Sequence, residues 1–299
     1  MKISLVLIIY RSDSTIAKDT SNYCENLFKS KGISSLKIDS NFNKTYLENQ
    51  LKLKAELPEI AVVLGGDGTV LKSVNVLINF KIPILSFNVG GNLGFLSQDK
   101  KYLLNQSFLS LLEKDEFSIN HRNMLQCKLY KKEIKQSNSY LESMQYFALN
   151  DFYFKSVDND ISPTNQISIE IDNEKVNEYK GDGLIISSTT GSTAYSMAAG
   201  GPIVHPSINA MVINPICPMS LSNRPIVVPG ESKIIVRLVK KMAGSLQLWK
   251  DGSKASTMTY SDYCEIKQAP IPAKLISLKN SISYYSTLIK KLDWKGNLS

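Results

Sequence analysis

The stretch IAVVLGGDGTVLKSVNVLINFKIPILSFNVGG, residues 60–91, decides the fold of the first part of the chain. It opens with an uninterrupted apolar run, residues 60–64, which is typical of a strand buried on both faces of a parallel sheet. Near-helical spacing then relates Val70, Leu71, Val74, Leu77 and Ile78. Residues 84–89 form a second apolar run, closed by Gly90-Gly91. Strand, glycine turn, helix and strand make a βαβ unit, so the pattern predicts a doubly wound α/β domain with a parallel sheet.

The sequence before this stretch fits the same alternation, and the sequence after it does not. Residues 3–10 are an almost wholly apolar run, expected as the first buried strand, and residues 19–31 have helical length and a mixed polar and apolar pattern. From about His121 the pattern changes to short alternating runs separated by turn residues, which predicts an antiparallel, β-rich second domain. These runs are residues 124–130, 146–154, 167–171, 184–187 and 233–238.

Helical spacing returns near the end of the chain. The residues that carry it are Ile282, Tyr285, Leu288, Ile289 and Leu292. We therefore expect an α/β domain over residues 1–118, a β-rich domain over residues 119–280, and a helix over residues 281–299 that returns to the first domain. The polar segment 131–139 is expected as a hairpin tip or an insertion.

Composition excludes several classes of protein. The chain has 299 residues, of which 43% are hydrophobic and 21% charged, so it is neither disordered, collagen-like nor a coiled coil overall. The four cysteines stand far apart with no histidine nearby, which argues against structural zinc and a disulfide framework and favours a reducing compartment. No run approaches the roughly 18 apolar residues of a membrane span. We expect a cytoplasmic protein without a membrane partner.

The charge balance is basic, with 35 Lys and Arg against 27 Asp and Glu, a net charge of +8. A positive field attracts small polyanions such as nucleotides. A nucleic-acid surface is the other interpretation, but the lysines are scattered and no aromatic ribonucleoprotein motif accompanies them. We expect small-molecule partners and no nucleic acid.

The turn Gly65-Gly66-Asp67-Gly68-Thr69 is the first candidate site. Its glycines let the backbone approach a bulky anion, and the free amides at the start of the following helix favour phosphate. A carboxylate there would repel phosphate, unless Asp67 accepts a proton from an attacking hydroxyl or helps to hold Mg²⁺. A simple turn residue or helix cap explains Asp67 equally well. Lys72, about one helical turn past Gly68, is in reach of a phosphate, although a surface lysine has the same pattern.

Two further patterns offer groups for a nucleotide. The pair Asn150-Asp151 interrupts a strand-like run with planar acceptors suited to ribose hydroxyls and a base edge, although a bulge or turn explains it as well. The segment 180–202 combines Lys180-Gly181-Asp182-Gly183, a short apolar strand, a run of small hydroxyl residues and Gly200-Gly201-Pro202. We expect this run to be too polar for a core and too regular for a linker, and Tyr195 is available to stack on a flat base.

Together these motifs resemble the ordered motif set of NAD kinases. The matching residues are Gly65 to Thr69, Asn88-Val89-Gly90 with Leu93-Gly94-Phe95-Leu96, Asn150-Asp151, Asp182-Gly183-Leu184-Ile185, and Thr190 to Tyr195. Gly-Gly-Asp-Gly-Thr alone is shared with diacylglycerol and sphingosine kinases and more loosely with phosphofructokinases. The Asn-Asp pair followed by Thr-Gly-Ser-Thr-Ala-Tyr narrows the resemblance to NAD kinases.

The resemblance implies phosphoryl transfer from ATP, or from polyphosphate, to the adenosine ribose 2′-hydroxyl of NAD, with Mg²⁺ or another divalent cation. It implies that Asp67 activates or orients the hydroxyl and that Gly68 and Lys72 sit beside the phosphates. The NAD pocket it implies comprises Asn150, Asp151, Lys180, Asp182, Thr190, Thr193, Ala194, Tyr195, Ser196, Met197 and Ala198. It also implies a β-sandwich-like second domain and a homodimer or homotetramer formed through it, with Asp182 reaching a neighbour's ligand.

Several residues depart from the family pattern, among them Ser188 in place of a typical Thr and Asn92 where a basic or His residue is frequent. Lys180 stands where Arg is common, which keeps the charge but loses the bidentate fork, while Thr189 replaces a typical Pro and Ser253 a common Gln.

Two rival functions share parts of the pattern. A lipid kinase of the diacylglycerol type would share the Gly65 to Thr69 turn, and a nucleotide-binding regulator would keep the pocket without the acid. The sequence alone does not separate ATP from polyphosphate as donor.

Overall fold

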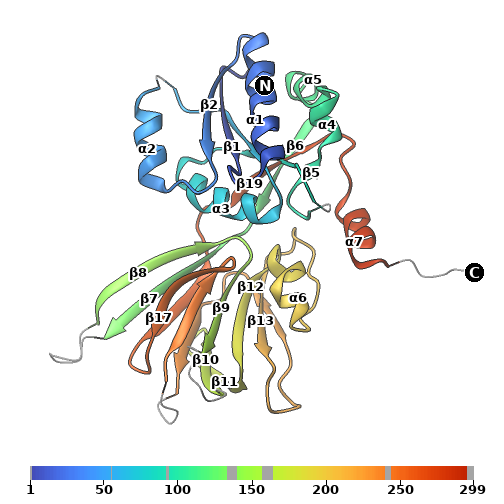
Figure 1. Ribbon diagram of the computed structural model, residues 1–299. Helices are drawn as coiled ribbons and strands as arrows, with labels where there is room; N and C mark the ends of the chain where they lie inside the picture. Colours follow the sequence, from blue (N-terminus) through green and yellow to red (C-terminus); the bar gives the residue numbers. More distant parts are fainter. Residues whose placement is uncertain are drawn as a thin grey trace, which may run out of the picture. The chain divides into compact units, whose positions relative to one another are not determined.

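The computed structural model describes residues 2–54, 56–91, 94–132, 140–156, 164–239 and 244–294. The chain divides into two compact units (Figure 1). The first comprises Met1–His121 together with Ala273–Ser299, and the second comprises Arg122–Pro272. The second unit is therefore inserted into the first.

The first unit is built on a sheet with the strand order β2-β1-β3-β4-β19-β6, with β5 pairing β4 at the side. The strands are β1 (Leu5–Tyr10), β2 (Ser34–Asp39), β3 (Ile60–Leu64), β4 (Ile84–Asn88), β5 (Gln98–Asp99), β6 (Phe117–Arg122) and β19 (Ala273–Leu278). The pairings β1 with β2, β1 with β3, β3 with β4 and β4 with β19 are all parallel. The predicted α/β class with a parallel sheet is confirmed. All residues of β3 and β4 are buried, as their continuous apolar runs predict.

Polar side chains cap several helices of this unit. They are α1 (Thr15–Ser30), α2 (Lys44–Lys52), α3 (Asp67–Leu77), the 3-10 turn η1 (Ile78–Phe80), α4 (Lys101–Leu104), α5 (Ser107–Glu113) and α7 (Tyr284–Leu292). The hydroxyl oxygen of Ser14 accepts from the amide of Ala17 at 3.3 Å, and Ser283 caps α7 in the same way. The C-terminal helix α7 belongs to this unit, and Lys291 places its ammonium 4.8 Å from the ring centre of Phe95.

The chain returns to the first unit earlier than the sequence predicts. The predicted second domain extends to residue 280, whereas β19 pairs with β4 and lies in the first unit's sheet. The buried residues of β19 are Ala273, Leu275, Ile276 and Leu278, a mixed pattern that fits either domain, so the sequence contains no signal for the partner strand.

The second unit consists of two antiparallel sheets. We call them the β10 sheet, with the order β11-β10-β15-β18-β7-β8, and the β12 sheet, with the order β14-β13-β12-β9-β16-β17. Their strands are β7 (Leu125–Lys132), β8 (Tyr140–Ala148), β9 (Asp151–Ser156), β10 (Asn165–Ile171), β11 (Glu174–Gly181), β12 (Gly183–Ser188), β13 (Ala210–Ile216), β14 (Ile226–Pro229), β15 (Ile234–Leu238), β16 (Leu246–Lys250), β17 (Ser253–Met258) and β18 (Tyr263–Gln268). The 3-10 turn η2 (Gly191–Thr193) and the short helix α6 (Tyr195–Ala198) follow β12. Residues 133–139 of the predicted hairpin tip lie outside the described residues.

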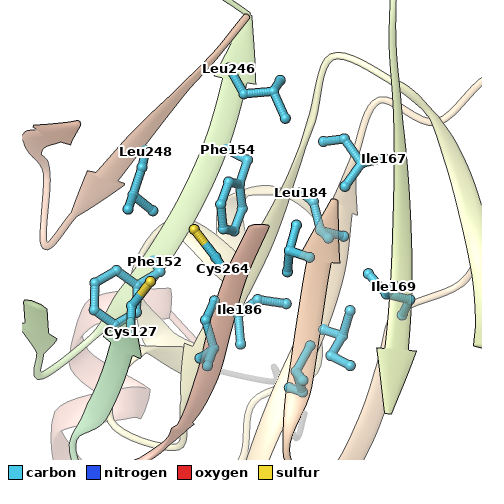
Figure 2. Packing of buried hydrophobic residues seen from close by; sticks show 14 of the residues in the cluster. Cys127, Phe152, Phe154, Ile167, Ile169, Leu184, Ile186, Leu246, Leu248 and Cys264 are labelled. Carbon is cyan, nitrogen blue, oxygen red and sulfur yellow. The ribbon is translucent and has the colours of Figure 1, made fainter. Parts of the chain in front are cut away.

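One apolar core joins the inner faces of the two sheets. Figure 2 shows Phe152 and Phe154 of β9 and Ile186 of β12 in one cluster with Cys127 of β7 and Ile169 of β10, and all five are fully buried. Alternate residues of each strand point into this core, which is the arrangement of a β-sandwich. The predicted β-rich, β-sandwich-like second domain is confirmed.

The core of the first unit depends on a cluster of three phenylalanines. The ring of Phe108 lies edge-on to Phe28 at 6.0 Å and to Phe87 at 5.4 Å between ring centres, and its side chain is fully buried. We expect Phe108→Ala to lower the free energy of unfolding by about 3–5 kcal/mol, because it removes a large apolar contact and leaves a cavity.

Urea unfolding followed by circular dichroism measures this change. Leu104→Ala is the matched control, since Leu104 is 62% exposed and its truncation should cost under about 0.5 kcal/mol. Equal destabilisation by both substitutions would contradict the assignment of Phe108 to the core.

Candidate functional site

The predicted turn between strand and helix is present in the first unit. Strand β3 ends at Leu64, and α3 begins at Asp67 with Gly66 as its cap residue. The carboxylate of Asp67 accepts hydrogen bonds from the backbone amides of Phe95 at 2.7 Å and Leu96 at 3.1 Å, and from Ser97 Oγ at 3.3 Å. The side chain therefore does not cap its own helix but is fixed by the segment that follows β4.

The segment that holds Asp67 requires a glycine. A Cβ atom on Gly94 would lie 1.9 Å from Asp67 Oδ1, so only glycine lets the backbone approach the carboxylate this closely. Asp67 is partly exposed and Gly68 is exposed, so a ligand can reach both. Leu93 of the resembling motif lies outside the described residues.

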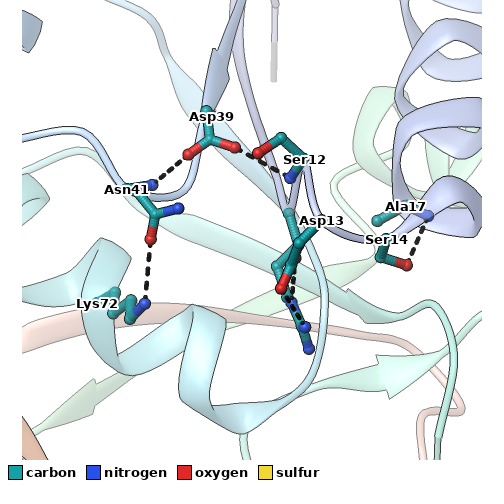
Figure 3. Close-up of polar contacts among 8 residues, drawn as sticks. Ser12, Asp13, Ser14, Ala17, Asp39, Asn41 and Lys72 are labelled. Carbon is teal, nitrogen blue, oxygen red and sulfur yellow. Dashed lines mark hydrogen bonds and ion pairs between the residues drawn. The ribbon is translucent and has the colours of Figure 1, made fainter.

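Lys72 is exposed on α3, and its ammonium donates to Asn41 Oδ1 at 3.2 Å. Figure 3 shows the group of polar contacts around it at the ends of β1 and β2. The carboxylate of Asp39 accepts from the amides of Ser12 at 3.0 Å and Asn41 at 2.7 Å. Lys72 is thus directed toward the loop after β2, where it adds a positive charge to the carboxyl edge of the sheet.

In the second unit, the pair Asn150-Asp151 lies at the turn between β8 and β9, with Asp151 as the first residue of β9. The carboxylate of Asp251, in the turn after β16, accepts from the amides of Leu149 at 2.9 Å, Asn150 at 2.7 Å and Asp151 at 3.3 Å. The amide of Asp251 in turn donates to the carbonyl of Asp151 at 3.1 Å. The sequence reasoning missed Asp251, and the available signal was the Asp251-Gly252 turn, in which both residues have positive φ.

Asp151 itself is 3% exposed. Burial, reinforced by the neighbouring charge of Asp251, raises the pKa of Asp151 to about 8. At neutral pH this carboxyl group is mostly protonated, so it can donate a hydrogen bond, whereas an ionised carboxylate can only accept one.

The hydroxyl-rich run after β12 is hydrogen-bonded to the turn between β8 and β9. Ser188 Oγ donates to the carbonyl of Leu149 at 2.5 Å and accepts from the amide of Gly191 at 3.1 Å. The amide of Ser188 donates to the carbonyl of Asn150 at 2.8 Å, and a Cβ atom on Gly191 would lie 2.2 Å from that same carbonyl oxygen. The structure therefore brings this run and the Asn150-Asp151 turn together.

Many hydroxyls of this run are buried, contrary to the expectation that it is too polar for a core. Ser192 Oγ, for example, donates to Thr189 O at 2.8 Å and accepts from the amide of Val204 at 3.0 Å, so this hydroxyl stabilises the folded loop. Within the described residues, Thr190 Oγ1 and Ser196 Oγ are buried without a hydrogen-bond partner. Thr193, Ala194, Tyr195 and Met197 are partly exposed, and Ala198 is exposed.

Lys180 and Asp182 lie at the opposite end of β12. Both are exposed, and the backbone around them is tied to the end of β13, where the amide of Asp182 donates to Ile216 O at 3.0 Å. A strand rises about 3.4 Å per residue, so the six residues of β12 separate Asp182 from Thr190 by roughly 20 Å. Within one chain, the structure does not bring Lys180 and Asp182 to the Asn150-Asp151 turn.

The described residues contain no group of three or more His, Cys, Asp or Glu side chains that could hold a metal ion. Across the same described stretches, no helix is long and apolar enough to cross a membrane.

The buried acid Asp151 predicts a pH-dependent stability. Its pKa is raised in the folded state, so the folded protein binds more protons than the unfolded chain between about pH 4 and pH 8, and stability falls as the pH rises through that window. We expect Asp151→Asn to flatten this fall, whose slope is roughly 1.4 kcal/mol per pH unit for one proton. Urea unfolding of both proteins across the window measures it, and parallel pH curves would contradict a protonated Asp151.

Two solved structures have the same fold. The crystal structure of yeast NADH kinase complexed with NADH matches with a TM-score of 0.81 at 23% sequence identity, covering 99% of this chain and 89% of that one. The crystal structure of an NAD kinase from Archaeoglobus fulgidus in complex with ATP matches with a TM-score of 0.71 at 22% identity, covering 98% of this chain and 100% of that one.

The two solved structures show the fold, whereas family models and sequence relatives show the family. The model of the ATP-NAD kinase N-terminal domain matches residues 6–116, and that of the ATP-NAD kinase C-terminal domain matches residues 150–278. NAD kinase 1 of Prochlorococcus marinus subsp. pastoris is 62% identical over 294 residues, 98% of each chain. NAD kinase 1 of Thermosynechococcus vestitus is 33% identical, covering 99% of this chain and 96% of its own. The chain belongs to the NAD kinase family, as its motifs predict.

Proposed function

We propose that this chain transfers the terminal phosphoryl group of ATP to the adenosine ribose 2′-hydroxyl of NAD, giving NADP and ADP, with Asp67 as the base or orienting acid. Membership of the NAD kinase family supports the reaction class. The observation that supports the residue is the fixed geometry of Asp67, whose carboxylate is held by two backbone amides and one hydroxyl and is still partly exposed.

In this reaction the 2′-oxygen attacks the γ-phosphorus as the bond from that phosphorus to the bridging oxygen breaks, and ADP leaves. The proton of the hydroxyl passes to Asp67. Most of phosphoryl-transfer catalysis is alignment and charge neutralisation. A carboxylate whose direction is set by backbone donors gives that alignment without a loss of side-chain freedom during the reaction.

The donor end of the proposed site involves Gly68, Lys72 and a divalent cation. Amides at the start of α3 are oriented for phosphate oxygens, and Lys72 adds a positive charge at the carboxyl edge of the sheet. A divalent cation would enter with ATP and neutralise the charge on its phosphate oxygens, as magnesium commonly does in phosphoryl transfer. Polyphosphate presents similar anions, so it stays an alternative donor.

The second unit provides the proposed contacts for NAD. These contacts lie at one end of β12 and comprise Asn150, Asp151, Thr190 and the run Thr193 to Ala198. The buried unpaired hydroxyls of Thr190 and Ser196 support a polar ligand there.

We propose that Lys180 and Asp182, at the opposite end of the strand, contact the ligand of a neighbouring subunit in a homodimer or homotetramer. Light scattering coupled to gel filtration measures the oligomeric state. The reaction and the scattered cysteines favour the cytoplasm as the location.

The reaction itself is tested by NADP formation from NAD, ATP and Mg²⁺, read through an NADP-specific dehydrogenase. We expect Asp67→Asn to lower turnover by more than about 100-fold because it removes the proton acceptor, while NAD binding measured by calorimetry survives. The control is Asp293→Asn, which changes an exposed carboxylate after α7 in a backbone conformation that Asn tolerates. Near-normal turnover of Asp67→Asn would remove Asp67 from this role.

A second variant tests the geometry around Asp67 and leaves its chemistry intact. Gly94→Ala places a methyl group against the carboxylate, so we expect a loss of turnover of about 10- to 100-fold with a normal circular dichroism spectrum. Gly244→Ala is the matched control, because nothing lies within 4 Å of its Cβ position. Full activity of Gly94→Ala would show that the close approach of Gly94 is not needed.

A further inference from the structure

The outer face of the β12 sheet carries a row of four side chains in register. Ile185 of β12 pairs with Asn214 of β13 on one side and with Tyr153 of β9 on the other, and Tyr153 pairs with Trp249 of β16. Their sequence neighbours Phe152, Phe154 and Leu248 point into the core, so the row faces away from it.

The short helix α6 is fixed by two members of this row. Asn214 Nδ2 donates to the carbonyls of Ser196 at 2.8 Å and Ala199 at 3.3 Å. The ring of Tyr195 packs edge-on against Tyr153, with 5.0 Å between the ring centres and 80° between the planes. Because α6 has only four residues, these contacts add to its few backbone hydrogen bonds in setting the direction of Tyr195.

Trp249 extends the aromatic surface on the other side of the contact, beside Tyr153. Its indole stacks on Tyr153 with 5.7 Å between the ring centres and 6° between the planes. The indole N–H is buried and has no hydrogen-bond acceptor within the described residues. Burial raises the pKa of Tyr153 to about 12, and the charges of the nearby Asp151 and Tyr195 contribute less to this shift. The phenol of Tyr153 is therefore neutral at neutral pH.

One face of Tyr195 is already covered. The ammonium of Lys155 lies 5.0 Å from the centre of the Tyr195 ring and 6.0 Å from that of Tyr153. The side chain of Tyr195 is nevertheless partly exposed, so a flat ligand can reach the ring and stack on it.

We propose that Tyr153 and Trp249 are positioning residues for Tyr195, and that together with Lys155 they direct the Tyr195 ring toward the adenine base of NAD. The proposal rests on the proposed function, which makes Tyr195 a contact of NAD. It predicts that disturbing the stack weakens NAD binding while the phosphoryl-transfer step is spared, because Asp67 lies in the other unit.

The spectroscopic test uses the two tryptophans of the chain, Trp249 and Trp294. Trp294→Phe removes the exposed tryptophan. It leaves the aromatic platform, by which we mean Tyr153, Lys155, Tyr195 and Trp249, unaltered. The remaining tryptophan emission then reports Trp249 alone. We expect NAD to change this emission saturably, and nicotinamide mononucleotide, which lacks adenine, to leave it unchanged. An unchanged emission at NAD concentrations that saturate catalysis would overturn the proposal, and so would an equal change with nicotinamide mononucleotide.

The kinetic test substitutes the stack itself in the natural background. We expect Tyr153→Ala to raise the KM for NAD by about 3- to 10-fold, with kcat within about twofold of the parent. Tyr153→Phe, which keeps the ring, and Trp249→Phe should retain a KM within about twofold. An unchanged KM in Tyr153→Ala, or a loss confined to kcat, would contradict a positioning role.

The two hypotheses fail differently. Suppose that the Trp294→Phe variant makes NADP at the parental rate but its tryptophan emission does not change when NAD is added. The hypothesis that Tyr153 and Trp249 position Tyr195 is then wrong, and the proposed function stands. If the parent chain makes no NADP, the proposed function itself fails. If the Tyr153→Ala variant does not fold, the emission experiment still tests the positioning hypothesis, because Trp294→Phe leaves Tyr153, Lys155, Tyr195 and Trp249 in place.

Discussion

Backbone amides that converge on a carboxylate organise both candidate regions of this chain. The amides of Phe95 and Leu96 hold Asp67 in the first unit, and the amides of Leu149, Asn150 and Asp151 hold Asp251 in the second. A strand that ends in a turn leaves amides without ladder partners, and an ionised carboxylate satisfies several of them at once. One side chain thus fixes two or three backbone positions, and the residues around each turn acquire a defined direction.

The two carboxylates have different consequences for chemistry. Asp67 keeps partial exposure, so the oxygens oriented by the amides can also meet a ligand. Asp251 instead acts on its neighbour Asp151: the burial of Asp151, reinforced by the charge of Asp251, raises the pKa of Asp151 and favours its protonated form. Two ionised carboxylates side by side in a buried turn would repel each other, and protonating one of them relieves this. The second unit therefore offers a neutral donor beside planar acceptors, which suits a ribose and a base better than a phosphate.

The sequence predicted those features that are local. The run Ile60–Leu64, the glycine turn and the start of α3 follow from apolar patterning and turn chemistry over a few residues, and the motif resemblance identified the family. The missed features depend on contacts distant in sequence. Asp251 is separated from Asn150 by 101 residues, and nothing in an Asp-Gly turn reveals whose amides it accepts. Ser192 belongs to a run expected from its sequence to be too polar for a core, yet its partners are backbone groups of Thr189 and Val204 that only the folded loop brings together. The roles of the proposed site residues remain predictions.

The strand β19 explains how a second unit can interrupt the first without destabilising it. The chain leaves the first unit through β6 and returns through β19, and these strands are neighbours in one sheet. Their junction is reinforced where Asn120 Nδ2 donates to Ser277 Oγ at 2.7 Å, and where the amide of Lys279 donates to Glu116 O at 2.9 Å. The ends of the insertion are therefore held side by side by the host sheet, so closing the long intervening segment requires little further loss of entropy. Each unit can then keep its own core, the three phenylalanines in one and the sandwich in the other, and mutations in one core should leave the other's packing intact.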